Sequence, residues 1–184
     1  MAAASPLLRD VATLIVETGM RPEEVFTIHK ENVHLKLRYL FVPNGKTHFA
    51  RRNVPLTDAT IDILKWRTVD TESPFVFPRK GDHDKPLTTV RKPHHKALRA
   101  ASIDPPFRLY DFRHTFGSRT AMAGVDLPTL KELMGHSDIS TTMRYVHPTP
   151  EHKQEAVRKL ERYNRDQVFG LYEPELGSPQ KSPQ

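Results

Sequence analysis

The spacing of the apolar residues changes twice along the chain, and this change constrains the fold more than any other feature. Apolar residues recur at helical spacing over residues 7–18, and Gly19 follows as a helix stop. A second helix is expected from Pro22, because proline is favoured in a first turn. From Val33 apolar and polar residues alternate, as they do in strands, and from Thr57 the helical spacing returns.

The alternating region predicts a small sheet. Three strand-like segments cover residues 33–37, 39–42 and 52–56, and Asn44-Gly45 between the last two is a typical turn signal. Strands joined by such short connections pair in the antiparallel sense. The chain is therefore expected to form an α+β fold that is mainly α-helical, with one small three-stranded antiparallel sheet.

The rest of the chain predicts further helices. One starts near residue 57, and others are expected at residues 88–101, 110–123, 128–134, 140–145 and 151–163, with a loop at residues 74–85. The last residues are rich in proline, serine, glutamine and glycine, a composition that buries too little apolar surface to fold. We expect one domain over residues 1–165 and a disordered tail over residues 166–184.

The charge balance indicates a polyanionic partner. Lysine and arginine total 28 against 22 acidic residues, which gives a net charge of +6, and the sequence pI is about 9.6.

The chain has no cysteine, which excludes disulfides, thiolate metal sites and cysteine nucleophiles. No apolar run approaches the roughly 20 residues that cross a bilayer, and the first residues do not read as a signal peptide. A cytoplasmic protein without a membrane partner is expected.

The segment from Leu133 to Tyr145 carries the most specific motif. A Gly135-His136 turn leads into a threonine-rich stretch, and Tyr145 follows His136 by nine residues (145 − 136). This segment resembles the best-known box of the tyrosine recombinases, the phage integrase family, in which a Leu-Gly-His turn precedes the nucleophilic tyrosine. The resemblance identifies Tyr145 as the candidate nucleophile.

Three further boxes resemble the same family and occur in its order. Arg113 lies 23 residues before His136 (136 − 113), within a segment similar to the His-x-Leu-Arg-His-Thr box. The segment around Arg21 resembles the first arginine box, with Glu24 as its acidic neighbour. Lys46, before the strand expected at residues 52–56, matches the catalytic lysine. Together the boxes span residues 7–163, and their combination is far more specific than any one of them.

The resemblance implies a site-specific recombinase or integrase that cuts and rejoins DNA through a 3′-phosphotyrosyl bond. Tyrosine suits this task because a phenolate is a moderate leaving group, so resealing needs no ATP. The arginines and the histidine would stabilise the phosphorane, and a proton donor would serve the leaving 5′-oxygen. The residues assigned by resemblance are Arg21, Lys46, Tyr110, Arg113, His136 and Tyr145, supported by Glu24 and His114. The implied partners are double-stranded DNA and other copies of the chain in a tetrameric synapse, and neither a metal nor a cofactor is implied.

Two features depart from the family pattern. Tyr110 stands where the family usually has histidine, and a tyrosine with a reference pKa of about 10 is a poor base at neutral pH. The N-terminal helical domain that usually clamps DNA is not expected within this chain.

Two alternatives stay open: a DNA-binding remnant without chemistry, and a DNA-relaxing enzyme similar to type IB topoisomerases. The helix expected at residues 151–163 either docks onto a neighbouring copy or packs on its own domain.

Overall fold

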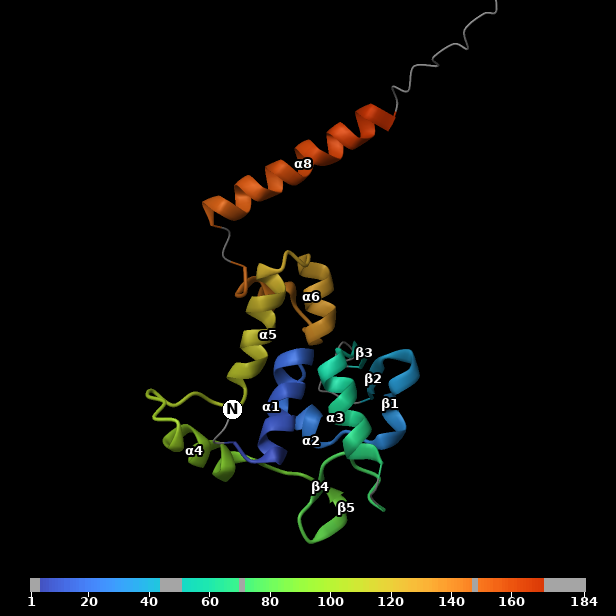
Figure 1. Cartoon of the computed structure of the whole chain (residues 1–184), viewed down its shortest axis with the longest axis vertical. Helices are drawn as coiled ribbons and strands as arrows, with labels where there is room; N and C mark the ends of the chain where they lie inside the picture. The colour runs from blue at the N-terminus through green and yellow to red at the C-terminus, as the bar shows by residue number, and fades with distance from the viewer. Residues whose placement is uncertain (1–3, 44–50, 70–71, 147–148, 171–184) are drawn as a thin grey trace, which may run out of the picture. The chain divides into compact units, whose positions relative to one another are not determined.

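The computed structural model describes residues 4–43, 51–69, 72–146 and 149–170. The chain divides into two compact units, residues 1–146 and residues 147–184. The helices of the described residues are α1 Pro6–Thr18, α2 Pro22–Phe26, α3 Asp58–Thr68, α4 Arg91–Ala100, α5 Asp111–Met122, α6 Leu127–Met134, α7 Ile139–Met143 and α8 Pro150–Gly170 (Figure 1). The strands are β1 Val33–His34, β2 Tyr39–Val42, β3 Arg52–Pro55, β4 Pro78–Arg79 and β5 Asp82–Pro86, and the short 3-10 helices are η1 Lys30–Asn32 and η2 Leu35–Leu37.

The expected three-stranded antiparallel sheet is confirmed, in the order β1-β2-β3. Leu40 on the central strand pairs with Val33 on one side and with Val54 on the other. Leu40, Val42 and Val54 are buried, because alternate residues of a strand point to the same face. The first strand is shorter than expected, since the chain turns back within η2 and Arg38 adopts a left-handed conformation.

Helix α1 is the central support of the first unit. It packs against α2, α3 and α5, and in Figure 1 it lies between α5 and α3. Leu14 and Ile15 of α1 are fully buried, and burying each such side chain contributes about 1.5–3 kcal/mol. Gly19 ends the helix with a φ of 66°, a left-handed conformation that glycine adopts without strain. The ring of Phe116 fills the space that a side chain at Gly19 would need, so this turn and α5 fit closely.

A second apolar cluster joins α5, α6 and the residues after α7. Its buried members are Leu130, Met134 and Tyr145, and Phe116 and Ala121 pack against them. The helix starts in this region follow ordinary capping rules. Asp126 caps α6 through a side-chain bond to the N–H of Thr129, and Asp138 caps α7 through the N–H of Ser140.

One expectation for the polar segments is wrong, and two helix boundaries differ from their expected positions. Residues 74–85, expected as a loop, contain the antiparallel pair β4-β5 around Gly81, which has a φ of 81°. The strand was missed because three of the five residues of Asp82–Pro86 are charged and none alternates with a large apolar residue. Helix α8 continues through residues 166–170, beyond the domain boundary expected at residue 165, because neither glycine nor proline interrupts the helix before Gly170. Helix α4 begins at Arg91 rather than near residue 88, which leaves Pro93 in its first turn.

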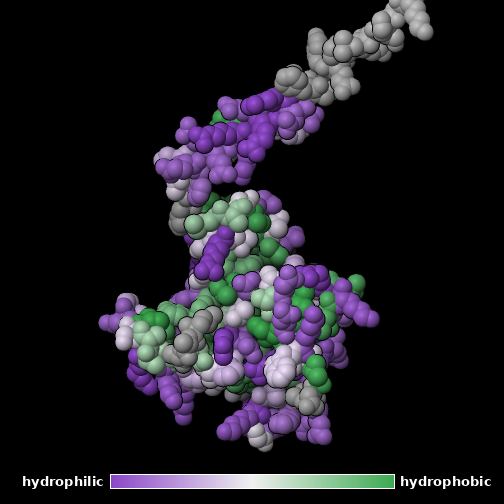
Figure 2. Space-filling model, in the orientation of Figure 1, coloured by the Kyte–Doolittle hydropathy of each residue, from purple (hydrophilic) through white to green (hydrophobic). Residues whose placement is uncertain are grey.

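None of the helices in the described part of the chain is long and apolar enough to cross a bilayer. The longest, α8, is strongly charged, and most of its surface visible in Figure 2 is hydrophilic.

Candidate active site

Most of the residues assigned to the site come from four separate segments of the first unit. Arg21 is the N-cap of α2, and Arg113 lies within α5. His136 follows the end of α6, and Tyr145 follows α7. Helix α1 contacts both α2 and α5, so it brings the segments of Arg21 and Arg113 together. The second apolar cluster, which contains Leu130, Met134 and Tyr145, holds the segments that follow α6 and α7. Lys46 and the Asn44-Gly45 turn lie outside the described residues.

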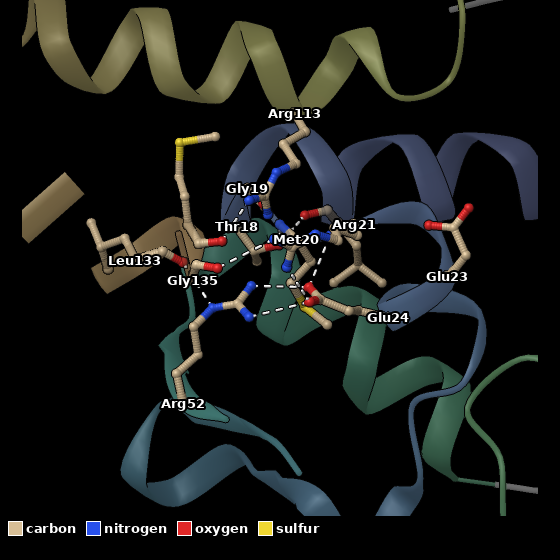
Figure 3. Close-up of polar contacts among 12 residues, drawn as sticks. Thr18, Gly19, Met20, Arg21, Glu23, Glu24, Arg52, Arg113, Leu133 and Gly135 are labelled. Carbon is tan, nitrogen blue, oxygen red and sulfur yellow. Dashed lines mark hydrogen bonds and ion pairs between the residues drawn. The ribbon is translucent and has the colours of Figure 1, made fainter. Parts of the chain in front are cut away.

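Arg113 is the most deeply buried of these groups, with no exposed surface. One terminal nitrogen donates to the Gly19 carbonyl, and the other donates to the Met134 carbonyl at 2.5 Å (Figure 3). Its Nε has no hydrogen-bond partner among the described residues. Burial, and next the positive charge of Arg21, lower the pKa of Arg113 to about 10, so the guanidinium stays protonated at neutral pH.

Arg21 is held by Glu24 in a reciprocal cap of α2. The Glu24 carboxylate accepts from the Arg21 backbone N–H at 2.9 Å and from its guanidinium at 2.8 Å. The other end of the guanidinium donates to the Gly135 carbonyl at 3.2 Å. The Arg21 side chain is one-third exposed, so it is accessible to an anion. Glu24, named by resemblance as the acidic neighbour of Arg21, is thus in direct contact with it.

Arg52 on β3 belongs to the same network, although no sequence motif pointed to it. Its guanidinium donates to both Glu24 oxygens, at 3.3 and 3.0 Å, and to the Leu133 carbonyl at 3.0 Å (Figure 3). A signal for its burial exists, because Arg52, Val54 and Leu56 alternate along the segment and the last two are buried. Burial raises the pKa of Glu24, but hydrogen bonds and charge from Arg52, and then from Arg21, outweigh this effect and hold the pKa below its ordinary value.

His136 lies beneath the ring of Tyr145 and is nearly buried. The two rings are stacked, with centroids 6.2 Å apart and an interplanar angle of 11°. Nδ1 of His136 is 3.0 Å from the hydroxyl of Thr142, a fully buried residue of α7 that the sequence analysis did not single out. Burial, and then the charges of Arg113 and Arg21, lower the pKa of His136 to about 4. The imidazole is therefore neutral at pH 7, with one N–H to donate.

Tyr145 is held in a narrow space against α5. Its hydroxyl is 2.9 Å from Nδ1 of His114, and only 8% of the residue is exposed. A Cβ atom added at Gly117 would come within 2.9 Å of three ring carbons of Tyr145, so only glycine leaves room for the ring. Burial raises the pKa of the phenol, an effect partly offset by the charge of Arg113.

Tyr110, at the N-cap of α5, lies next to this pair. Its ring meets His114 edge to face, with centroids 5.1 Å apart. Burial lowers the pKa of His114, so this imidazole is also neutral at pH 7. Within the described part of the chain, His114 is thus the imidazole in hydrogen-bond contact with the candidate nucleophile, and the departure at Tyr110 leaves that contact intact.

The arrangement concentrates fixed positive charge and neutral hydrogen-bond donors around one phenol. Guanidinium groups suit a phosphate because each offers parallel N–H groups to its oxygens. Among the described residues, no group of three or more His, Cys, Asp or Glu side chains is placed to hold a metal ion.

Known proteins resemble this chain over most of its length. The model of the phage integrase family matches residues 3–152. A tyrosine recombinase of Thermosipho africanus is 31% identical over 150 residues, which are 80% of this chain and 52% of that protein. The integrase of Salmonella phage P22 is 28% identical over 182 residues, which cover 92% of this chain and 45% of the phage protein. The chain thus spans about half the length of these relatives.

Solved structures share the fold. The catalytic domain of bacteriophage HP1 integrase matches with a TM-score of 0.61 and 29% identity, over 83% of this chain and 82% of that domain. An integrase of the transposon Tn1549, in complex with a circular intermediate DNA, matches with a TM-score of 0.69 and 19% identity, over 85% of this chain and 60% of the integrase chain. On the match over residues 3–152 and these likenesses, the chain belongs to the phage integrase family.

Proposed function

We propose that this chain cuts and rejoins double-stranded DNA as a site-specific tyrosine recombinase. One observation carries the proposal: Tyr145 stacks on His136 in a cluster that also contains the buried guanidinium of Arg113. The DNA-bound Tn1549 integrase has the same fold, which supports DNA as the partner.

In the proposed first step, the Tyr145 oxygen attacks the scissile phosphorus and its proton passes to His114. The 2.9 Å contact supports this assignment, provided that the tautomer leaves Nδ1 unprotonated. The bond from phosphorus to the 5′-oxygen breaks, and Lys46 delivers the proton to that oxygen. A 3′-phosphotyrosyl bond remains. In the second step, the oxygen of a free 5′-hydroxyl attacks the same phosphorus and passes its proton to Lys46. The bond from phosphorus to the Tyr145 oxygen breaks, and the phenolate takes its proton back from His114.

Arg21, Arg113 and His136 would stabilise the charge on the non-bridging oxygens. A buried N–H without a partner costs about 1–3 kcal/mol, and Nε of Arg113 has no partner in the described ranges of the chain. A phosphate oxygen that accepted from it would remove this cost when DNA binds. The partly exposed Arg21 would meet the phosphate first.

Self-association on DNA, in a tetrameric synapse, is part of the proposal. Considered alone, α8 carries exposed apolar residues at intervals of three, Val157, Leu160 and Tyr163, each more than half exposed. Such a stripe on a charged helix fits an apolar surface on a neighbouring copy. Light scattering of DNA complexes formed by Leu160→Asp would test this, since a helix that packs on its own domain leaves the stoichiometry unchanged. The cytoplasmic location expected from the sequence stays a prediction.

The decisive test is a nicked suicide substrate that traps the covalent intermediate. The full chain should form a denaturation-resistant DNA adduct, mapped to Tyr145, and Tyr145→Phe should form none while binding DNA as before. DNA binding without any adduct would favour a non-catalytic DNA-binding protein. Relaxation of supercoils without strand exchange would favour an enzyme similar to type IB topoisomerases.

A further inference from the structure

Three successive backbone carbonyls at the end of α6 each accept a hydrogen bond from a different arginine. The arginines come from β3, α5 and the N-cap of α2, which are far apart in the sequence. The pairs are Arg52 with Leu133 at 3.0 Å, Arg113 with Met134 at 2.5 Å, and Arg21 with Gly135 at 3.2 Å.

The end of α6 suits this task for two reasons. The last carbonyls of a helix have no partner within the helix, and the helix dipole places negative charge there. Gly135 has a φ of 63° and closes the helix through N–H bonds from Gly135 to Glu132 and from His136 to Lys131. The carbonyls of residues 133–135 stay available to the three guanidinium groups.

Arg52 differs from the other two arginines in its surroundings. Its side chain is 7% exposed, and it forms a two-pronged ion pair with Glu24, which is 9% exposed. Glu24 also binds Arg21, so its carboxylate links Arg52 to Arg21. The end of α6 links Arg52 to Arg113, because the two arginines bind the successive carbonyls of Leu133 and Met134. A Cβ atom at Gly135 would lie 2.7 Å from Nη1 of Arg52, so the turn and the guanidinium fit closely.

We propose that Arg52 is a positioning residue of the active site: it fixes the end of α6 and the Glu24 carboxylate, and thereby holds Arg113 and Arg21 in place for the phosphate. The role rests on the proposed DNA cleavage, because positioning matters only where a phosphate is bound. A lysine would not replace Arg52, because one ammonium group cannot reproduce the parallel bonds to Glu24 together with the bond to Leu133.

The test compares Arg52→Lys and Arg52→Ala with Arg51→Ala in the full chain. Arg51 is the matched control, because it removes the same charge one residue away, from an exposed side chain over the ring of Phe41. We expect both Arg52 variants to lower the single-turnover cleavage rate by about 100-fold, the size expected when reacting groups shift by about 1 Å. Their DNA affinity should fall no further than that of Arg51→Ala.

Folding is checked by thermal unfolding of each variant. If Arg52→Ala does not fold, because the buried Glu24 loses its ion pair with Arg52, Arg52→Lys decides the question, since it keeps the charge. Cleavage by Arg52→Lys at the wild-type rate would overturn the proposal. So would an Arg52 defect that lies in DNA affinity alone, because a simple phosphate contact would explain it.

A second measurement does not depend on cleavage. The Nη protons of Arg113 are buried and bonded to two carbonyls, so they should exchange slowly and give resolved NMR signals. We expect Arg52→Lys to shift or broaden these signals and Arg51→Ala to leave them unchanged. If the wild-type chain forms no adduct but these signals respond as expected, the proposed function is wrong and the positioning by Arg52 stands. Unchanged signals in a folded Arg52→Lys would overturn the positioning role.

Discussion

The hydroxyl of Tyr145 lies 2.9 Å from Nδ1 of His114, a residue that follows Arg113 directly in the sequence. One turn of α5 therefore carries both a buried guanidinium and the imidazole that contacts the candidate nucleophile. The usual family histidine three residues before Arg113 is replaced by Tyr110, and the contact made by His114 offers a different route for the phenolic proton.

His114→Ala should slow formation of the covalent adduct by about 10²–10⁴-fold, the range for loss of general-base catalysis. Burial lowers the pKa of His114, so the wild-type rate should stay high as the pH falls below 7 and drop only below the ordinary histidine value of 6.5. In His114→Ala this fall in rate at low pH, the acid limb of the pH–rate profile, should be lost. A pH–rate profile of single-turnover cleavage checks both points, and an unchanged acid limb in the variant would assign the proton to another group.

His136 should make folding stability depend on pH between about 6.5 and 4. Its folded pKa of about 4 lies below the unfolded value of 6.5, so the unfolded chain binds an extra proton in this window. Stability is therefore lost as the pH falls through it, by up to about 3 kcal/mol at 1.36 kcal/mol per pKa unit.

Urea unfolding at pH 7 and pH 5 measures the part of this loss that falls between pH 6.5 and 5, about 2 kcal/mol at 1.36 kcal/mol per pH unit, and His136→Gln should reduce it. His83→Gln, at an exposed position, is the control and should leave the loss intact. Glu24 acts in a lower window: its folded pKa lies below 4.5, so its contribution is present above pH 4.5 and disappears in stronger acid. A His136→Gln variant with the full loss between pH 7 and pH 5 would contradict the assignment.

Gly117→Ala should displace the ring of Tyr145, because the added methyl group would lie 2.9 Å from its carbons. Overpacking of this kind costs about 1–3 kcal/mol of stability. Nitration of Tyr145 with tetranitromethane should become faster, since the displaced phenol is more exposed. Ser118→Ala, the next position of α5, should change neither the stability nor the nitration rate by a comparable amount.

Lys46 can be tested through the leaving group, although it lies outside the described residues. Lys46→Ala should bind DNA and lose cleavage, because a 5′-alkoxide is expelled slowly without a proton. A bridging 5′-sulfur leaves readily as a thiolate, so this substrate should restore cleavage by Lys46→Ala but not by Arg113→Ala, whose role is charge stabilisation. If sulfur rescues neither variant, another group delivers the proton.

The sequence predicted the helices and the sheet well where apolar spacing was regular, as in α1 and the pair β2-β3. It failed at β4-β5, because a hairpin of charged residues has no apolar face to mark it. The site motifs named Glu24 as the acidic neighbour of Arg21, and their separation of three residues within one helical turn sets their contact locally.

The long-range contacts of the site needed the structure. The approach of Tyr145 to His114 spans 31 positions, and that of Arg52 to Leu133 spans 81. No local pattern sets such distances. The alternation of Arg52 with Val54 and Leu56 indicated only that Arg52 faces inward, and its partners depend on how α6 meets the sheet.

The use of main-chain carbonyls as anchors for Arg21, Arg52 and Arg113 has a consequence for how this region can vary. Every amino acid supplies a carbonyl, so apolar exchanges of similar volume at Leu133 and Met134 preserve the anchors. The arginines themselves have no substitute with the same planar array of donors. In a saturation-mutagenesis library selected for recombination, Leu133 and Met134 should therefore vary among apolar residues of similar volume, while Gly135 and the three arginines stay invariant.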